Sequence, residues 1–98
     1  MGTDITIEEH SVVVASTNQL STEIPGEVVI LNAETGMYHG MEAVGARIWQ
    51  LLQRPRTVHD IQATLLKEYD VDPDYCNQDL IHLLQELTAA GLVEVSDT

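Results

Sequence analysis

Three aspartates at alternate positions, Asp70, Asp72 and Asp74, are the first side chains that could bind a metal ion. They match the first three ligand positions of a helix–loop–helix calcium site, whose ligands are carboxylate oxygens. Two other positions fail, because Tyr75 stands where the sharp turn needs glycine and Ile81 stands where a bidentate glutamate is needed. The aspartates are better explained as helix-capping residues, and no calcium site is expected.

Histidine and cysteine are the other candidates for a metal site or a nucleophile. No two of them stand at the short spacing of a zinc ligand pair. They are His10, His39, His59, His82 and Cys76. A helix start lowers a thiol pKa, whereas the nearby Asp72, Asp74 and Asp79 raise that of Cys76. Serine-nucleophile motifs and glycine-rich phosphate loops are absent. We therefore expect no enzyme, no metal and no cofactor.

Charge excludes two common partners of small domains. The 98 residues carry 16 Asp and Glu against 4 Lys and Arg, a formal net charge of -12. Nucleic acids and anionic membranes both attract clustered cations, so neither partner is expected. The longest apolar runs, Val12–Ala15 and Val28–Leu31, are too short to span a bilayer. A single cysteine and the absence of a signal-peptide pattern favour a cytoplasmic protein.

Short β-type segments fill the first part of the chain. Val12–Val14 predicts one strand, and a turn-rich loop with an extended piece at Leu20–Ile24 follows. Glu27–Asn32 and Met37–Gly40, joined by a turn at Gly36, predict a β-hairpin. The continuous Val28–Leu31 run predicts a central strand that is buried on both faces.

Helical periodicity dominates from residue 42 onward. The first helix is expected over residues 42–53, where Pro55 ends it. The second begins at Thr57 as N-cap, and the third begins at Asp72 and Pro73 and stops at Gly91. A short apolar segment, Leu92–Val95, is predicted to form a strand end or wing.

These elements predict a winged helix-turn-helix of the α+β class, in which a small three-stranded antiparallel sheet is followed by three helices. Residues 1–98 form a single domain, because the chain is too short for a second core. Residues 1–10 are expected to be flexible.

Two surfaces of this fold could bind a ligand. The strand at Met37–Gly40 is expected at a sheet edge, where unpaired backbone groups can accept a guest strand. The apolar stripe of the third helix is wider than one core face needs, so part of it could line a groove with Met37 and Met41 nearby. The plain alternatives are a solvated edge strand and a simple core stripe. The stripe comprises Cys76, Leu80, Leu83, Leu84 and Leu87.

From Val29 to the end, the chain resembles the PqqD-like family. The resemblance is carried by "LN-x-x-TG-x-Y", by "M-E-A-V-G-A-R-I-W-x-L-L" and by the closing "D-x-x-x-L-L-x-x-L-x-x-x-G-L-V". Each motif is weak alone, and their combination is specific. The chain departs from the family at Met41–Glu42, where Leu-Asn is common.

The resemblance implies a recognition domain that binds the leader of a ribosomally made precursor peptide. The leader would add as a strand to Met37, Tyr38, His39 and Gly40. Its apolar side chains would lie against the third-helix stripe, at Cys76, Leu80, Leu83, Leu84 and Leu87. By the same resemblance, the Tyr38 ring is expected to be at least partly in the core.

The family has two branches that fit a free-standing chain. Lasso-peptide members hand the precursor to a separate cysteine protease, and "GARIWQLL" before a threonine-led helix favours this branch. Quinone-cofactor members serve a radical S-adenosylmethionine enzyme. Two other classes stay open: a DNA-binding winged helix, disfavoured by the absence of Lys and Arg after Lys67, and a small carrier or enzyme, disfavoured by the lack of an Asp-Ser attachment site.

Overall fold

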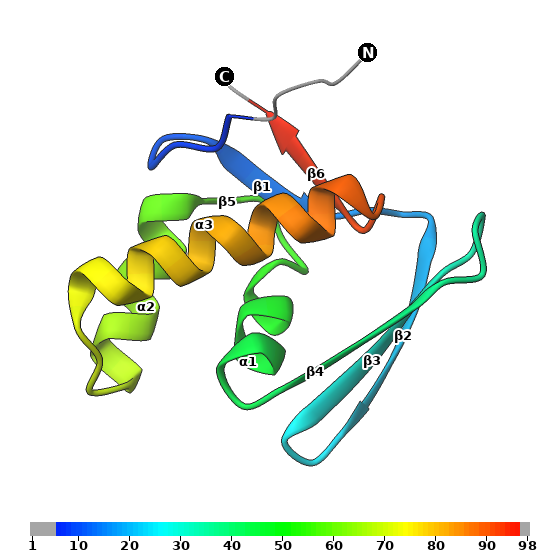
Figure 1. Ribbon diagram of the computed structural model, residues 1–98, viewed down its shortest axis with the longest axis horizontal. Helices are drawn as coiled ribbons and strands as arrows, with labels where there is room; N and C mark the ends of the chain where they lie inside the picture. Colours follow the sequence, from blue (N-terminus) through cyan, green and yellow to red (C-terminus); the bar gives the residue numbers. More distant parts are fainter. Residues whose placement is uncertain (1–5, 97–98) are drawn as a thin grey trace.

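Two antiparallel sheets and three helices make up the part of the chain that the computed structural model describes, residues 6–96 (Figure 1). The elements in order are β1 (Val12–Ala15), β2 (Gln19–Ile24), β3 (Glu27–Asn32), β4 (Tyr38–Glu42), α1 (Val44–Leu51), β5 (Arg56–Thr57), α2 (Val58–Glu68), α3 (Pro73–Ala89) and β6 (Val93–Ser96). The predicted α+β class is confirmed.

The first sheet has the order β5-β1-β6 and joins the two ends of the described chain. Its central residue Val13 pairs with Arg56 on one side and Val95 on the other. The prediction of a single three-stranded sheet ahead of the helices is therefore wrong in detail. The strand β1 does not pair with the β3–β4 hairpin but with β5 and β6, which are distant in the chain. The expected wing at Leu92–Val95 supplies one of them, β6.

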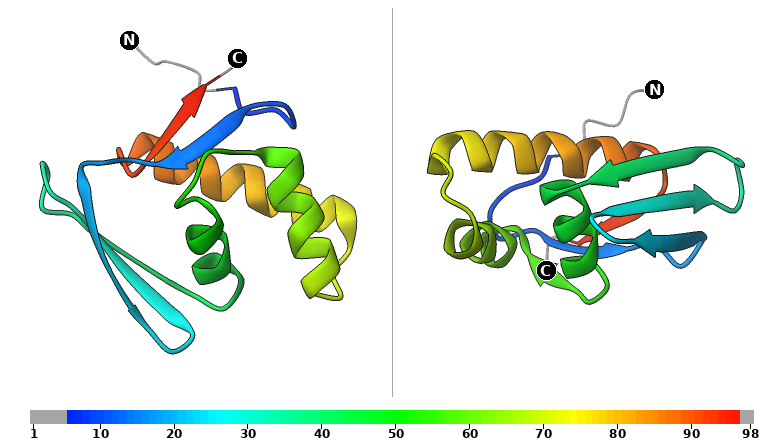
Figure 2. Two further views of the ribbon diagram at one scale, coloured as in Figure 1. Left: turned by 180° about the vertical axis from the view of Figure 1, so that it is seen from behind. Right: turned by 90° about the horizontal axis from the view of Figure 1, so that it is seen from below.

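The second sheet has the order β2-β3-β4, and it contains the predicted hairpin. Its central strand β3 alternates: Val28 and Ile30 are fully buried, whereas Val29 is 40% exposed. The prediction of burial on both faces is wrong, because α1 covers only one side of this sheet (Figure 2).

The helix α1 is shorter than predicted. Met41 and Glu42 remain in β4, and Ala43 turns the chain with a positive φ of 53° before the helix begins at Val44. The predicted caps of the other two helices are confirmed. The Thr57 hydroxyl accepts the Asp60 N–H at 3.1 Å, and an Asp72 carboxylate oxygen accepts the Asp74 N–H at 2.9 Å.

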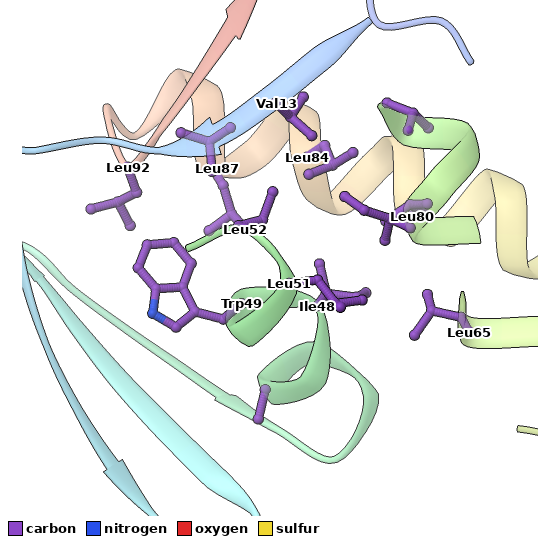
Figure 3. Close-up of a cluster of buried hydrophobic side chains, with 14 of the residues drawn as sticks. Val13, Ile48, Trp49, Leu51, Leu52, Leu65, Leu80, Leu84, Leu87 and Leu92 are labelled. Atoms are coloured by element: carbon purple, nitrogen blue, oxygen red, sulfur yellow. The ribbon is translucent and has the colours of Figure 1, made fainter. Parts of the chain in front are cut away.

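The core lies where α1, α3 and β1 meet (Figure 3). Trp49 is 1% exposed and packs among aliphatic side chains, in a chain that contains no phenylalanine. Leu84 and Leu87 of α3 and Leu52 after α1 belong to the same cluster. Aliphatic burial of this kind is the main source of stability in a domain of this size.

The described part of the segment expected to be flexible, residues 6–10, makes contacts with the rest of the fold. Residues 1–5 of the segment expected to be flexible lie outside the described residues. Ile7 is only 6% exposed, and Ser11 closes a turn by accepting the Glu8 N–H at 3.0 Å. His59 donates its N–H to the Glu9 carbonyl, which ties this turn to the start of α2.

Candidate functional site

The strand β4 has one open edge. It pairs only with β3 among the described strands. Hydrogen bonds from Asn32 N–H to the Met37 carbonyl and from Ala43 N–H to the Gly26 carbonyl fix the register. Because bonding alternates along an antiparallel pair, the backbone groups of Tyr38, Gly40 and Glu42 point away from β3. The open edge of β4 therefore offers three residues with backbone donors and acceptors to a guest strand.

The side chains of β4 alternate between the two faces of the sheet. His39 and Met41 lie opposite the buried Ile30 and Val28, so they share the inner face with α1. Tyr38 lies on the outer face and is 69% exposed. The expectation that the Tyr38 ring is partly in the core is wrong, because its neighbour Leu31 also faces outward.

A cavity of about 670 Å³ opens between α1, α2 and α3. Its walls are predominantly apolar. The apolar side chains that line it are Val44, Ile48, Leu65, Tyr69, Val71, Tyr75, Cys76, Leu80 and Leu83. A space of this size fits one or two large apolar side chains of a bound peptide.

The rim of this cavity is acidic. Asp72, Asp79 and Glu86 line it, together with His82, whose Nε2 lies 3.0 Å from a Glu86 carboxylate oxygen. None of the lining residues is Lys or Arg. The cavity therefore favours apolar groups that carry, or lie beside, positive charge.

Cys76 lies in the cavity wall as a thiol. Burial, and secondarily the negative charge of Asp79, raises the pKa of the Cys76 thiol above its ordinary value. A raised pKa lowers the thiolate population, which is the opposite of what a nucleophile requires. Within residues 6–96, no three His, Cys, Asp or Glu side chains come together as a possible metal site.

The structure places the predicted site residues in three groups. Cys76, Leu80 and Leu83 line the cavity. Leu84 and Leu87, with exposures of 0% and 1%, lie beneath it in the core and line no cavity wall. Met37, Tyr38, His39 and Gly40 lie at the β3–β4 turn and along β4, outside the cavity lining.

The helix α1 connects the strand edge to the cavity. Val44 and Gly45, which are separated from β4 only by Ala43, line the cavity. Figure 1 shows α1 between β4 and α3, and the second view in Figure 2 shows β4 as the strand of its sheet nearest the side of α3. A strand added to β4 would therefore run along α1 and could direct side chains toward α3.

The part of the site around the α2–α3 turn was not predicted from the sequence. Tyr69, Val71 and Tyr75 line the cavity, and Val71 and Tyr75 are 42% and 71% exposed. The signal was present, since three large apolar residues interrupt an otherwise acidic turn. In the sequence, the aspartates of this turn indicate helix caps, and capping assigns no role to the apolar residues beside them.

Fold and site together define a small winged-helix domain of the α+β class with an open strand edge beside an apolar cavity. Residues 27–93 match the family described as coenzyme PQQ synthesis protein D (PqqD), and the chain belongs to this family. The family resemblance inferred from the motifs is confirmed.

Two solved structures are similar to this chain. One is TbiB1 in complex with the TbiA(beta) leader peptide, with 37% identity over 83% of this chain and 94% of that chain and a TM-score of 0.78. The other is lasso peptide synthetase B1 complexed with the leader peptide, with 21% identity over 84% of this chain and 96% of that one and a TM-score of 0.73. The second shows likeness of fold. None of the curated proteins compared with the chain matches it.

Proposed function

We propose that this protein is a non-catalytic leader-peptide-binding protein that presents a ribosomally made precursor to a separate maturation enzyme. The observation that carries the proposal is the open edge of β4 next to the apolar cavity between the three helices. Membership of the PqqD family and the leader peptide bound by the 37% identical TbiB1 support it.

Binding would occur by strand addition. Backbone groups of Tyr38, Gly40 and Glu42 would pair with the leader, which gives affinity with little demand on its sequence. Alternate leader side chains would face α1 and α3, and one of them would enter the cavity at Leu80, Leu83 and Tyr75. Burial of one large side chain contributes roughly 1.5–3 kcal/mol, so two or three such contacts offset the ordering of the peptide.

The acidic rim adds a charge preference. Asp72, Asp79 and Glu86 would favour a leader with Lys or Arg next to its apolar anchors. The net charge of -12 would also speed encounter with a basic leader at low salt.

The protein's own contribution would be to raise the effective concentration of the precursor at the enzyme. The partner we propose is the cysteine protease of a lasso-peptide pathway, acting in the cytoplasm. TbiB1 and the shared fold of the lasso peptide synthetase B1 make this branch the first to test. The alternative is a radical S-adenosylmethionine enzyme of quinone-cofactor synthesis, since the family description names coenzyme PQQ synthesis.

Titration of a fluorescent leader peptide tests the site. The probes are the leader of the precursor encoded with this protein and the TbiA(beta) leader. Tyr75→Ala and Leu83→Asp should weaken binding at least tenfold, since each removes an apolar wall of the cavity. Leu66→Asp is the matched control, because Leu66 is a half-buried leucine on α2 outside the cavity lining. A Leu84→Asp variant would not test peptide binding, because a charge at this fully buried position destabilises the fold itself.

Backbone N-methylation of the leader tests strand addition directly. Methylation of successive amides should weaken binding at every second position, because only alternate amides face β4. Cys76 gives a second measurement, since it is the single cysteine of the chain and lines the cavity. Its alkylation by iodoacetamide should slow at least fivefold when the leader is bound. No binding of either leader, or loss without alternation, would contradict the proposal.

Reconstitution separates delivery from catalysis. The precursor should keep its mass when incubated with this protein alone, and the cysteine protease should cleave it faster when the protein is added. Cleavage by this protein alone would show an enzyme. Acceleration of a radical S-adenosylmethionine enzyme in place of the protease would assign the quinone branch.

A further inference from the structure

The outer face of the β2-β3-β4 sheet carries a second exposed apolar surface. The strand register sets Leu20 opposite Leu31 and Leu31 opposite Tyr38, so these three side chains share one face. Val29 and Ile24 lie on the same face, since residues two apart on a strand point the same way. We call Leu20, Ile24, Val29, Leu31 and Tyr38 the outer patch.

The exposure of the outer patch is high for large apolar side chains. Leu20 is 66%, Tyr38 69%, Ile24 48% and Val29 40% exposed. The other exposed large apolar residues among those described are Met37, beside Tyr38, and Val71 and Tyr75 in the cavity. Exposed apolar residues therefore gather in two places, and contiguous patches of this kind mark interaction sites.

The outer patch is open in the described fold. The contacts of α1 with β3 and β4 lie on the inner face, where Val28, Ile30 and Met41 point. Figure 1 and the first view in Figure 2 show no helix on the other side of this sheet. The cavity and the outer patch thus lie on opposite sides of the sheet.

Charge at one end of the outer patch indicates what would cover it. Glu27 lies directly opposite Glu42 across the strands, next to Ile24. Like charges at directly opposite positions destabilise a sheet. The sequence has no Lys or Arg before Arg47 to compensate them, and no ion pair involving either glutamate is found within residues 6–96. A Lys or Arg side chain of a partner would relieve this repulsion.

We propose that the outer patch docks the maturation enzyme, through an apolar surface of that enzyme flanked by Lys or Arg. The proposal rests on the function proposed above, and it places the enzyme and the leader on different sides of one sheet. A second copy of this chain fits less well, since it would bring another net charge of -12 and no cation from its own sheet. The leader and the enzyme could then bind at the same time, since neither would displace the other.

Three variants test the docking surface. Leu20→Thr combined with Val29→Thr removes apolar area and keeps residues that suit a strand. Glu27→Gln removes the like-charge pair. Glu23→Gln is the matched control, because Glu23 is an exposed glutamate of β2 whose partner Val28 faces inward, so it lies on the opposite face.

The measurements are the affinities of each variant for two ligands. One is the purified cysteine protease encoded with the precursor, called the peptidase below, and the other is the fluorescent leader. The double variant should bind the peptidase at least tenfold more weakly and the leader within twofold of wild type. Glu27→Gln should weaken peptidase binding about threefold at 50 mM NaCl, with little effect at 500 mM, and should raise thermal stability. Glu23→Gln should leave peptidase binding unchanged.

Several results would overturn the inference. One is peptidase binding that is absent in wild type or unaffected by the double variant. Another is a wild-type dimer in sedimentation velocity that the double variant converts to monomer, which would assign the outer patch to self-association.

One further result separates this inference from the function proposed above. If the leader fails to bind while peptidase binding stays intact and depends on the outer patch, the proposed function is contradicted and the docking surface is supported.

Discussion

Asn32 joins three parts of the fold with one side chain. It is only 4% exposed, and its amide nitrogen donates to the Ala90 carbonyl at the end of α3 at 2.7 Å. Its amide oxygen accepts the N–H groups of Glu34 and Thr35 in the hairpin turn at 2.8 and 3.1 Å. Asn32 therefore fixes the β3–β4 hairpin, and with it the open edge, relative to α3.

Replacement of Asn32 by alanine should lower the free energy of unfolding by about 2–3 kcal/mol, because buried backbone groups lose their partners. Urea unfolding monitored by the fluorescence of Trp49, the single tryptophan, measures the loss. Asn18→Ala is the control, since its side chain donates to Glu34 at an exposed site and should cost under about 0.5 kcal/mol. Equal losses for the two variants would show that Asn32 does not join these parts.

At the scale of elements, one ion pair joins the helices α1 and α2, which form two walls of the cavity. Arg47 of α1 donates from Nε and from a terminal nitrogen to the two carboxylate oxygens of Glu68 at the end of α2, at 2.8 and 2.7 Å. The hydrogen bond from Arg47, assisted by its charge, lowers the pKa of Glu68 from its ordinary value of 4.5. Bidentate geometry of this kind is the favourable case for a surface pair.

The contribution of this pair to stability should depend on pH in one direction. Because the folded state holds the Glu68 pKa below 4.5, the contribution is complete above that pH and is lost as the pH falls through the lowered pKa. Glu68→Gln should therefore reduce stability at pH 7 and have a smaller effect at pH 3. Urea unfolding at both pH values measures the difference, and Glu94→Gln, an exposed carboxylate on β6, serves as control. An effect of Glu68→Gln that is equal at both pH values would contradict the ion-pair argument.

Local features of these elements could be predicted, and long-range features could not. The caps at Thr57 and Asp72 depend on neighbouring residues alone, and both are confirmed. The pairing of Val13 with Arg56 and Val95 depends on residues far apart in the chain, and it was missed. The one-sided burial of β3 likewise depends on where α1 packs, which the Val28–Leu31 run alone does not contain.

The third-helix stripe shows the same limit at the site. At about 100° per residue, Leu84 and Leu87 lie within about 40° of Leu80, whereas Leu83 lies about 60° away on one flank. All four belong to a single apolar stripe in the sequence. Only the position of α2 and α1 decides that Leu83 faces the cavity while Leu84 and Leu87 face the core. The sequence pattern therefore predicted which face of the third helix is apolar. It could not predict which residues of that face line the cavity and which lie in the core.

For the whole molecule, net charge works against the compact state. A charge of -12 on 98 residues concentrates repulsion in the fold, and salt screens it. Raising NaCl from 20 to 500 mM at pH 7 should therefore stabilise the protein by roughly 1 kcal/mol, a rise in Tm of about 4–8 °C. Differential scanning calorimetry measures the shift. Glu27→Gln combined with Glu42→Gln should show a smaller rise, and a Tm that falls with salt would contradict the argument.

The β2-β3-β4 sheet has two open edges, since β2 and β4 each pair only with β3 in the described chain. Open edges are templates for aggregation, and this sheet has an apolar outer face as well. Acidic repulsion between copies keeps such edges apart at neutral pH, and it vanishes near the pI of about 4.3. The surplus of carboxylates thus also favours solubility: it would keep β4 open to the basic leader proposed above and disfavours pairing of β4 with other copies of the same chain.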